Sequence, residues 1–223
     1  MAIIHRTTMT PTKLEHLASW LPTQPWYLGT GRTPALSKSG GFRLDDPEGE
    51  VGIEFMVATD DSGDRPVSYH VPLSYRAAPL EGAEQGLIGT SEHGVLGQRW
   101  IYDGTHDPVL VAQLLELLQD RAEPQAQSLT DTPDPSVVVH FTGTGVAGGV
   151  LSTTVTNGPH DTRLTVDTAA SAPARRLVLQ VKRVLQPGDT SPADASGHVT
   201  AGWRSPDGGE NRAVFALLHD TDS

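Results

Sequence analysis

The stretch 100–115, "WIYDGTHDPVLVAQLL", places two aromatic residues, an aspartate and a histidine directly in front of a leucine-rich run. Trp100 and Tyr102 fall on one side of an alternating pattern, which predicts a short strand over 98–103. An acidic and a histidine side chain beside aromatic rings could form the lip of an active site. They could also be an ordinary junction between a strand and a helix, and the local pattern favours that interpretation.

A helix is predicted to follow over 108–119. Asp107 is a good N-cap, because its side chain can accept hydrogen bonds from unpaired backbone N–H groups, and Pro108 suits the first helical position. Leucines recur on one face and form a wide stripe for a core, and Pro124 lies beyond the end. Asn caps about as well as Asp, so Asp107→Asn should be mild if capping is the only role of this residue.

The N-terminal part predicts a second helix and a β-hairpin. Thr10 followed by Pro11 is interpreted as the start of a helix over 11–21, in which leucines recur at helical spacing. The runs 51–58 and 66–75 alternate in polarity on either side of the loop "DDSGD" and predict an antiparallel hairpin. The two prolines of the second run cannot donate ladder hydrogen bonds, so this strand is expected near a sheet edge.

The whole pattern predicts an α+β fold, with antiparallel sheets and two main helices. Residues 1–122 are expected to form an α+β subdomain and residues 137–223 a mostly β subdomain. The Pro-rich, polar segment 123–136 between them is interpreted as a linker. The second subdomain consists of short β-patterned runs that are separated by Gly- and Pro-rich turns.

Composition narrows the classes of function. The 223-residue chain has a formal net charge of −11, which disfavours nucleic acid and anionic membranes as partners. It contains no Cys, which excludes disulfides, thiolate metal sites and cysteine nucleophiles. The sequence begins without the apolar core of a signal peptide, and no apolar run is long enough to span a membrane. We therefore expect a soluble, cytoplasmic protein.

Common catalytic motifs do not occur in the sequence, which has no HExxH and no G-x-S-x-G. The glycine-rich stretch 143–149, "GTGVAGG", could be a phosphate-binding loop. However, a Walker loop requires Lys and Ser or Thr after the glycines, and a dinucleotide fingerprint requires a helix there. The strand-like run "VLSTTVT" follows instead, so a plain hairpin turn is favoured and neither a cofactor nor a metal is expected.

The segment 24–32, "QPWYLGTGR", is the most informative short motif. Its distinctive members are Trp26, Tyr27, Gly29, Gly31 and Arg32. Two aromatic rings, two glycines that allow close backbone approach and an arginine could form a platform for sugar or phosphate. The favoured alternative is a loop between a helix and a strand, in which Trp26 fills the core and Arg32 pairs with a carboxylate.

Two motifs carry a resemblance to a known family. One is "QPWYLGTGR", which matches an aromatic-Gly-Gly-Lys-Gly-Arg element. The other is a Gly-x-x-Trp-x-Tyr-Asp strand that leads into an Asp-Pro helix, formed here by Gly97, Trp100, Tyr102, Asp103, Asp107 and Pro108. Their order and spacing over roughly residues 1–120 resemble the N-terminal cap of actinobacterial maltokinases. Those kinases phosphorylate maltose with ATP on a trehalose-to-glycogen route.

The resemblance implies that 1–122 is a cap-like subdomain and that 137–223 is similar to the intermediate β subdomain of these kinases. The chain departs from the family pattern at Thr30, where the cap loop usually has Lys, and at Gln180, where the nucleotide-binding Lys is expected. It also lacks the His-x-Asp-x-x-x-x-Asn segment that supplies a catalytic base and a metal ligand in kinase-like phosphotransferases. The resemblance thus implies a stand-alone relative without kinase activity.

We therefore expect a non-catalytic module of glycogen, α-glucan or trehalose metabolism that docks on a protein partner, either a sugar kinase or an α-glucan enzyme. The candidate contact residues are Trp26, Tyr27, Gly29, Gly31, Arg32, Trp100, Tyr102 and Asp103. One alternative is a carbohydrate-binding module that stacks maltooligosaccharide on the Trp and Tyr rings. A small sugar phosphotransferase is a weaker alternative. α-Glucan branching is rejected, because it needs a pair of carboxylates, typically on a barrel of about 250 residues.

Overall fold

The structure is a computed structural model that describes residues 9–29, 31–129, 132–146, 148–169, 175–189 and 194–220. Two short α-helices and three 3₁₀ turns accompany the strands: α1 (Lys13–Trp20), α2 (Pro108–Leu118), η1 (Leu21–Thr23), η2 (Glu84–Gly86) and η3 (Gly104–His106). The strands are β1 (Met9–Thr10), β2 (Leu36–Leu44), β3 (Gly52–Asp60), β4 (Val67–Arg76), β5 (Leu87–His93), β6 (Gly97–Asp103), β7 (Gln125–Ala126), β8 (Val138–Phe141), β9 (Val150–Asn157), β10 (Asp161–Thr168), β11 (Arg176–Lys182), β12 (Val184–Leu185), β13 (Gly197–Arg204) and β14 (Glu210–Asp220).

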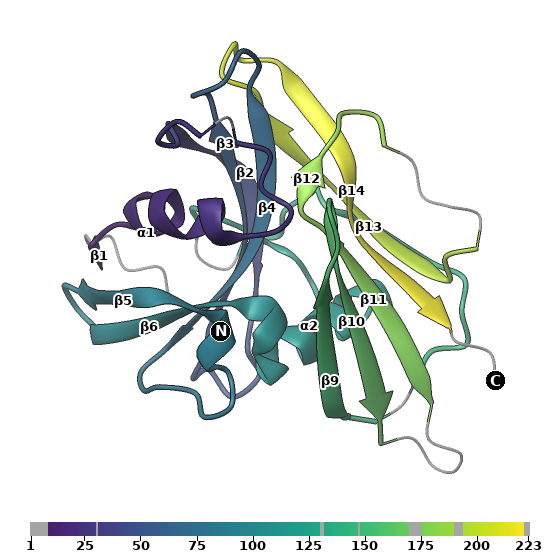
Figure 1. Cartoon of the computed structure of the whole chain (residues 1–223). Helices are drawn as coiled ribbons and strands as arrows, with labels where there is room; N and C mark the ends of the chain where they lie inside the picture. The colour runs from purple at the N-terminus through teal and green to yellow at the C-terminus, as the bar shows by residue number, and fades with distance from the viewer. Residues whose placement is uncertain are drawn as a thin grey trace.

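The sheet closes on itself. Its ladder runs β4–β3–β2–β13–β14–β11, and β12, which follows β11 after one residue, pairs back with β4. All of these pairs are antiparallel, so the strands form a closed ring (Figure 1). Strands β6, β5 and β1 extend the sheet beyond β4, whereas β10 and β9 extend it beyond β11.

Strands β2 and β13 meet at one close contact. Gly40 lies opposite Trp203, and this is the single Cα pair that the two strands share in the described structure. A Cβ atom on Gly40 would lie 2.9 Å from the Cβ of Trp203 and 3.0 Å from its Cα. Because neither of those atoms can rotate away, the closure requires glycine at this position.

Two apolar clusters lie on opposite faces of the β3–β4 hairpin. The larger one includes the interior of the ring, where the Phe42 centroid lies 4.6 Å from that of Phe55 and 6.2 Å from that of Phe215. The leucines of α2 belong to the same cluster. The smaller cluster is covered by α1 and Trp26. Alternation predicted apolar residues on one face of each strand. Both faces of β3 and β4 are buried, so apolar residues occur on both.

Helix α1 begins at a different residue from the one predicted. Thr12 is the N-cap: its side chain accepts a hydrogen bond from the backbone N–H of Glu15, and the Glu15 carboxylate accepts one from the N–H of Thr12. This capping box satisfies two unpaired donors, which a cap at Thr10 could not do. Thr10 instead pairs with β5 as part of β1.

The predicted edge position of the second hairpin strand is wrong, because β4 is flanked by β3 on one side and by β12 and β6 on the other. On that second side the N–H of His70 donates to the carbonyl of Arg183 at 2.9 Å. Backbone groups two residues apart in a strand face the same side, so the nitrogen of Pro72 also faces β12 and β6. Pro72 lies after the part of β4 that pairs with β12 and before the part that pairs with β6. The strand therefore places proline where a neighbour changes and no N–H is needed.

The two predicted helices, the β3–β4 hairpin and the strands of the second half are confirmed, and the architecture is dominated by antiparallel β-structure. Strands β2 and β5 were not predicted; register shifts interrupt the pairing of both and break their alternation. The loop 143–149 is not a hairpin turn, since it joins β8, which pairs with β13, to β9, which pairs with β10.

The segment predicted as a linker contributes β7, which pairs with β2. Strands from both sides of this segment share the sheet and the larger apolar cluster, while the division into subdomains stays a prediction. Neither described helix has the length and apolar content needed to cross a membrane.

His70 is a polar side chain inside the aromatic interior of the ring. Its ring centroid lies 4.6 Å from that of Phe215 and 5.9 Å from that of Phe55. Nδ1 hydrogen-bonds the carbonyl of Lys182 at 2.9 Å, and Nε2 has no partner among the described residues. Burial lowers the pKa of His70 to about 3, so the imidazole is neutral at pH 7. Nδ1 must then carry the proton, because a carbonyl only accepts.

This burial predicts a loss of stability in mild acid. The unfolded chain protonates this histidine near its ordinary value of 6.5, whereas the folded chain does so only near pH 3. The contribution of neutral His70 is therefore complete above pH 6.5 and declines as the pH falls towards 3, by at most about 1.4 kcal/mol per pH unit. Between pH 7 and 5, wild type should lose about 2 kcal/mol more unfolding free energy than His70→Gln, which keeps a donor for Lys182.

Urea unfolding at a series of pH values measures this difference. His160→Gln, at an exposed position, is the matched control and should keep the wild-type pH dependence. Equal slopes for wild type and His70→Gln between pH 7 and 5 would show that His70 does not control acid stability.

Candidate functional site

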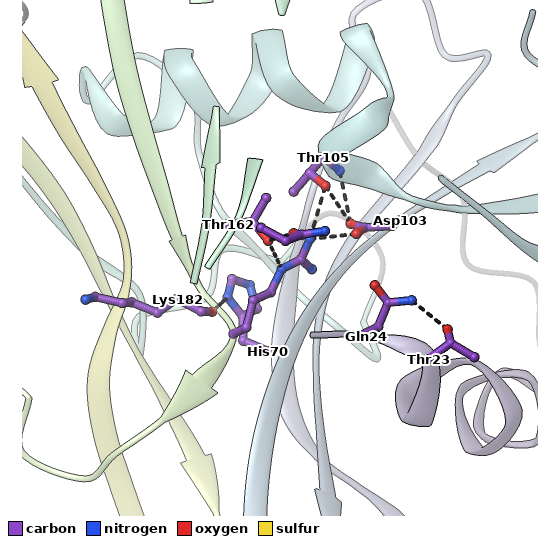
Figure 2. A network of polar contacts seen from close by, with 9 residues as sticks. Thr23, Gln24, His70, Asp103, Thr105, Thr162 and Lys182 are labelled. Atoms are coloured by element: carbon purple, nitrogen blue, oxygen red, sulfur yellow. Dashed lines mark hydrogen bonds and ion pairs between the residues drawn. The ribbon is translucent and has the colours of Figure 1, made fainter. Parts of the chain in front are cut away.

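A fully buried ion pair lies where the sheet closes. Arg183 is the residue between β11 and β12, and its Nη2 lies 2.6 Å from Oδ2 of Asp103 at the end of β6. The same Nη2 donates to the hydroxyl of Thr105 at 3.1 Å, while Nε donates to the hydroxyl of Thr162 at 2.7 Å. Figure 2 shows Asp103, Thr105 and Thr162 converging on one guanidinium group, with His70 and Lys182 beside its stem.

The Trp26 ring covers this guanidinium group. The Arg183 Cζ lies 5.0 Å from the Trp26 ring centroid, which is a cation–π distance, and the Trp26 side chain is completely buried. Trp20 and Tyr69 pack against the same ring, with centroids at 5.7 and 6.0 Å. Nη1 of Arg183 has no hydrogen-bond partner among the described residues. The interpretation that Trp26 fills the core is therefore confirmed.

The residues after Trp26 are fixed to the β3–β4 hairpin. The Tyr27 hydroxyl donates to Oδ2 of Asp60 at 2.9 Å, and the backbone N–H of Leu28 donates to the Tyr69 hydroxyl at 3.0 Å. Burial raises the pKa of Tyr69 to about 12. Burial alone would raise the pKa of the Asp60 carboxyl, but hydrogen bonds from Ser62, from the backbone of residue 35 and from Tyr27 hold it below its usual range.

The two motif glycines, Gly29 and Gly31, are required by the local backbone geometry. A Cβ atom on Gly29 would lie 1.9 Å from the Tyr27 ring, so this ring can fold back only over a glycine. Gly31 has a φ of +79°, which a side chain would disfavour. Arg32 is exposed and donates to the carbonyl of Ser62 at 3.0 Å, whereas a carboxylate was predicted as its partner. Thr30 lies outside the described residues.

The second motif is likewise built into the framework. Tyr102 is buried, and its hydroxyl accepts a hydrogen bond from the backbone N–H of Leu80 at 2.8 Å. Asp103 caps the η3 turn by accepting bonds from the N–H and the hydroxyl of Thr105. Trp100 is half-buried on β6, between its cross-strand neighbours Arg76 and Thr90. Of the four predicted stacking rings, those of Trp26 and Tyr102 therefore have no free face.

Asp107 caps α2 as predicted and also forms an ion pair that was not predicted. Its Oδ1 accepts from the N–H of Val109 at 3.0 Å, while both carboxylate oxygens accept from the Arg76 guanidinium at 2.7 Å. Burial would raise the pKa of this carboxyl, but the Arg76 hydrogen bonds hold it below its usual value. The expectation that Asn replaces Asp107 with little loss is therefore withdrawn, since Asn cannot complete a charged bidentate pair.

The buried carboxylate of Glu54 on β3 was not predicted by the sequence analysis. It receives hydrogen bonds from Lys13 at 2.5 Å, from the Tyr75 hydroxyl at 2.6 Å and from Gln127 at 2.7 Å. Burial raises its pKa, but Lys13, which lies on α1, contributes most to bringing it below the usual range. The contact ties α1 to the sheet. A glutamate inside the apolar run "VGIEFMVA" was the available signal.

One Ser–His pair has the spacing of a catalytic dyad. Nε2 of His16 lies 2.9 Å from Oγ of Ser91 and 3.1 Å from the carbonyl of Thr90. The Ser91 hydroxyl donates to the carbonyl of Pro11 at 2.7 Å, so its proton is already committed. His16 acts as the donor towards Ser91 and Thr90, and the pair anchors α1 to β5. This geometry does not activate a nucleophile.

Cofactor sites find equally little support. Gln180 occupies the position where a nucleotide-binding Lys was expected. Its side chain donates a hydrogen bond to the Asp161 carboxylate on the neighbouring strand β10. In the loop 143–149, the N–H of Val146 donates to Gln119 at 2.5 Å and therefore serves the end of α2. Within the described ranges, no group of three or more His, Asp or Glu residues is arranged to hold a metal ion.

The fold and the buried junction thus define a β-dominated framework whose two sequence motifs lie in and around its core. Residues 20–107 match the family model of the maltokinase N-terminal cap domain. The match extends from the end of α1 to the N-cap of α2 and includes the first motif and all of the second except Pro108. Over this range the chain is similar to the N-terminal cap domain of maltokinases.

The buried ion pair predicts strong coupling between its partners. Arg183→Met leaves the Asp103 carboxylate without its counter-charge and should lower the unfolding free energy by about 3–5 kcal/mol. Adding Asp103→Asn removes that charge while keeping the oxygen that caps η3, so the double variant should recover about 2 kcal/mol. Denaturant unfolding of the four proteins measures the coupling. Effects that add within about 0.5 kcal/mol would mean that the two residues do not form the pair.

Asp107 predicts a graded series. Asp107→Asn keeps the cap but loses the charged pair with Arg76, so it should cost about 2 kcal/mol of unfolding free energy. Asp107→Ala loses both and should cost about 3–5 kcal/mol. Thermal or urea unfolding ranks the three proteins. An Asn variant as stable as wild type would mean that the Arg76 pair contributes nothing.

Proposed function

We propose that this chain is a non-catalytic docking module of α-glucan or trehalose metabolism, in the actinobacterial cytoplasm, and that it binds a sugar kinase or another α-glucan enzyme. One observation carries the proposal: in the segment that matches the cap, the motif residues Trp26, Tyr102, Asp103 and Asp107 are buried in the framework. What the chain shares with maltokinases is therefore a scaffold. A scaffold without a reactive site acts through its surface.

The carbohydrate-binding alternative finds less support. Stacking on a sugar needs an exposed ring face, and Tyr27 and Trp100 are the two motif rings that keep partial exposure. Tyr27 already uses its hydroxyl to bind Asp60 and rests on Tyr69, with ring centroids 5.4 Å apart. A single free ring at Trp100 gives a weak platform for an oligosaccharide.

The phosphotransferase alternative finds less support again. Phosphoryl transfer depends on positioning and on the neutralisation of charge by Lys and metal-bound carboxylates. Gln180 stands at the expected Lys position and is bonded to Asp161. Lys182 lies two residues further along β11, roughly 7 Å away, which is a large displacement for a group that must contact a phosphate. The family match covers the cap and no catalytic lobe.

Affinity capture with the tagged full chain, from a native lysate with and without maltose, tests the docking function. We expect a sugar kinase or an α-glucan enzyme to be enriched in both conditions. The purified enzyme and the chain should then form a complex in sedimentation velocity. Absence of both enzyme classes would reject the docking proposal. Saturable binding of maltooligosaccharide to the isolated chain, abolished by Trp100→Ala but not by Trp20→Ala, would instead establish the carbohydrate alternative.

Mg-ATP should not bind with useful affinity. The chain carries a net charge of −11, and no Lys is positioned to offset a triphosphate at the expected site. Calorimetric titration with Mg-ATP, in the presence of maltose or glucosamine, should give no saturable heat. A micromolar dissociation constant, or phosphorylated sugar formed by the isolated chain, would contradict the non-catalytic assignment.

A further inference from the structure

Strand β9 ends the sheet without the usual protection of an edge. It pairs with β10 on one side, and no described strand pairs with its other side. Its sequence, "VLSTTVTN", contains no charged residue and no proline over eight residues. Exposed edges are normally blunted by Lys, by Pro or by short length, because their free N–H and C=O groups pair readily with another chain.

The pairing of the β9–β10 hairpin shows which backbone groups are free. The N–H of Gly158 donates to the carbonyl of Asp161 at 2.8 Å. Counting back by alternation, Thr156, Thr154 and Ser152 form the hydrogen-bonded pairs with β10. The N–H and C=O groups of the residues between them, Val155 and Thr153, therefore point away from β10. No described residue forms a hydrogen bond with these backbone groups.

A cleft of about 270 Å³ runs beside this strand. Its lining is mixed in polarity: Leu151, Thr153 and Val155 of β9 face the segment 80–83, η3 and the start of α2 there. The Thr153 hydroxyl oxygen is buried in this wall and has no hydrogen-bond partner among the described residues. Leu151, at the same wall, is 67% exposed. Buried hydroxyls normally have partners, so Thr153 indicates a missing one.

We infer that β9 accepts an extended strand of the partner protein, which lengthens the sheet by one strand and places its apolar side chains in the cleft. The inference rests on the proposed docking function and names its surface. Main-chain hydrogen bonds supply affinity in this mode, and alternate side chains supply specificity. Because the chain carries a charge of −11 and Glu81 lines the cleft, the incoming strand is apolar or hydroxylic at its centre and basic at its ends. A second copy of the chain would bring the same negative charge and fits less well.

A capped synthetic peptide of alternating valine and threonine, with lysines at both ends, is the probe. Amide hydrogen exchange of the full chain should show new protection at Thr153 and Val155, and none at Thr154, which is already bonded to β10. Leu151→Lys places a charge on the exposed rim, and removing the apolar contact should weaken peptide binding about tenfold or more. Val138→Lys, at a similarly exposed position of β8, is the matched control and should bind like wild type.

Absence of protection on β9 at millimolar peptide, or equal effects of the two lysine variants, overturns the inference. A concentration-dependent dimer that Leu151→Lys dissociates would make a second copy the occupant and would also overturn it. The lysate capture separates the two proposals: a kinase or glucan enzyme that Leu151→Lys still retains at wild-type level supports docking and rejects β9 as its surface. A peptide that protects β9, with no such enzyme captured, supports the strand site and rejects the proposed partner.

Discussion

Arg183 and Asp103, 80 residues apart in the chain and both shielded from water, form the contact on which the closed sheet depends. Arg183 is the single residue between β11 and β12, and its backbone is used on both sides: its N–H donates to His160 and its carbonyl accepts from His70. Its Nη2 lies 2.6 Å from Oδ2 of Asp103, at the end of β6 and within the segment that matches the cap domain. A buried ion pair contributes little net stability, but an incorrect pairing of these strands would leave an unpaired charge in the interior. The pair therefore favours one closure over its alternatives.

The motifs that relate this chain to maltokinases are placed around that closure. Trp26 covers the guanidinium, Asp103 supplies the counter-charge, and Tyr102 holds the loop at Leu80. A motif made of aromatic residues, glycines and charges resembles a ligand site, because the same residue types serve recognition. In this chain Gly29 leaves room for the Tyr27 ring, and Gly31 adopts a positive φ. Two of the four motif rings, those of Trp26 and Tyr102, are buried in the core. The family match thus covers motif residues that build the framework.

The free edge of β9 lacks the proline and charged residues that normally protect a sheet edge. β4 contains a proline and remains an interior strand, since Pro72 falls where the neighbouring strand changes. β9 contains neither proline nor charge and ends the sheet. β6 and β12 together flank the second side of β4, whereas β9 pairs with β10 alone among the described strands.

The sequence by itself determined the elements with a strong period or cap. The leucine stripe behind Asp107 specified α2, and alternation specified the β3–β4 hairpin and the strands of the second half, because side-chain burial in each repeats within a few residues. Local pattern missed β2 and β5, where register shifts break the alternation, and it chose Thr10 over the capping box at Thr12. Only the tertiary structure decided the ring closure, the role of Trp26 as a cover for a buried charge, and the pairing of Arg76 with Asp107. These contacts join residues 31 to more than 150 positions apart, so no local period could specify which of the many carboxylates, rings and strands would meet.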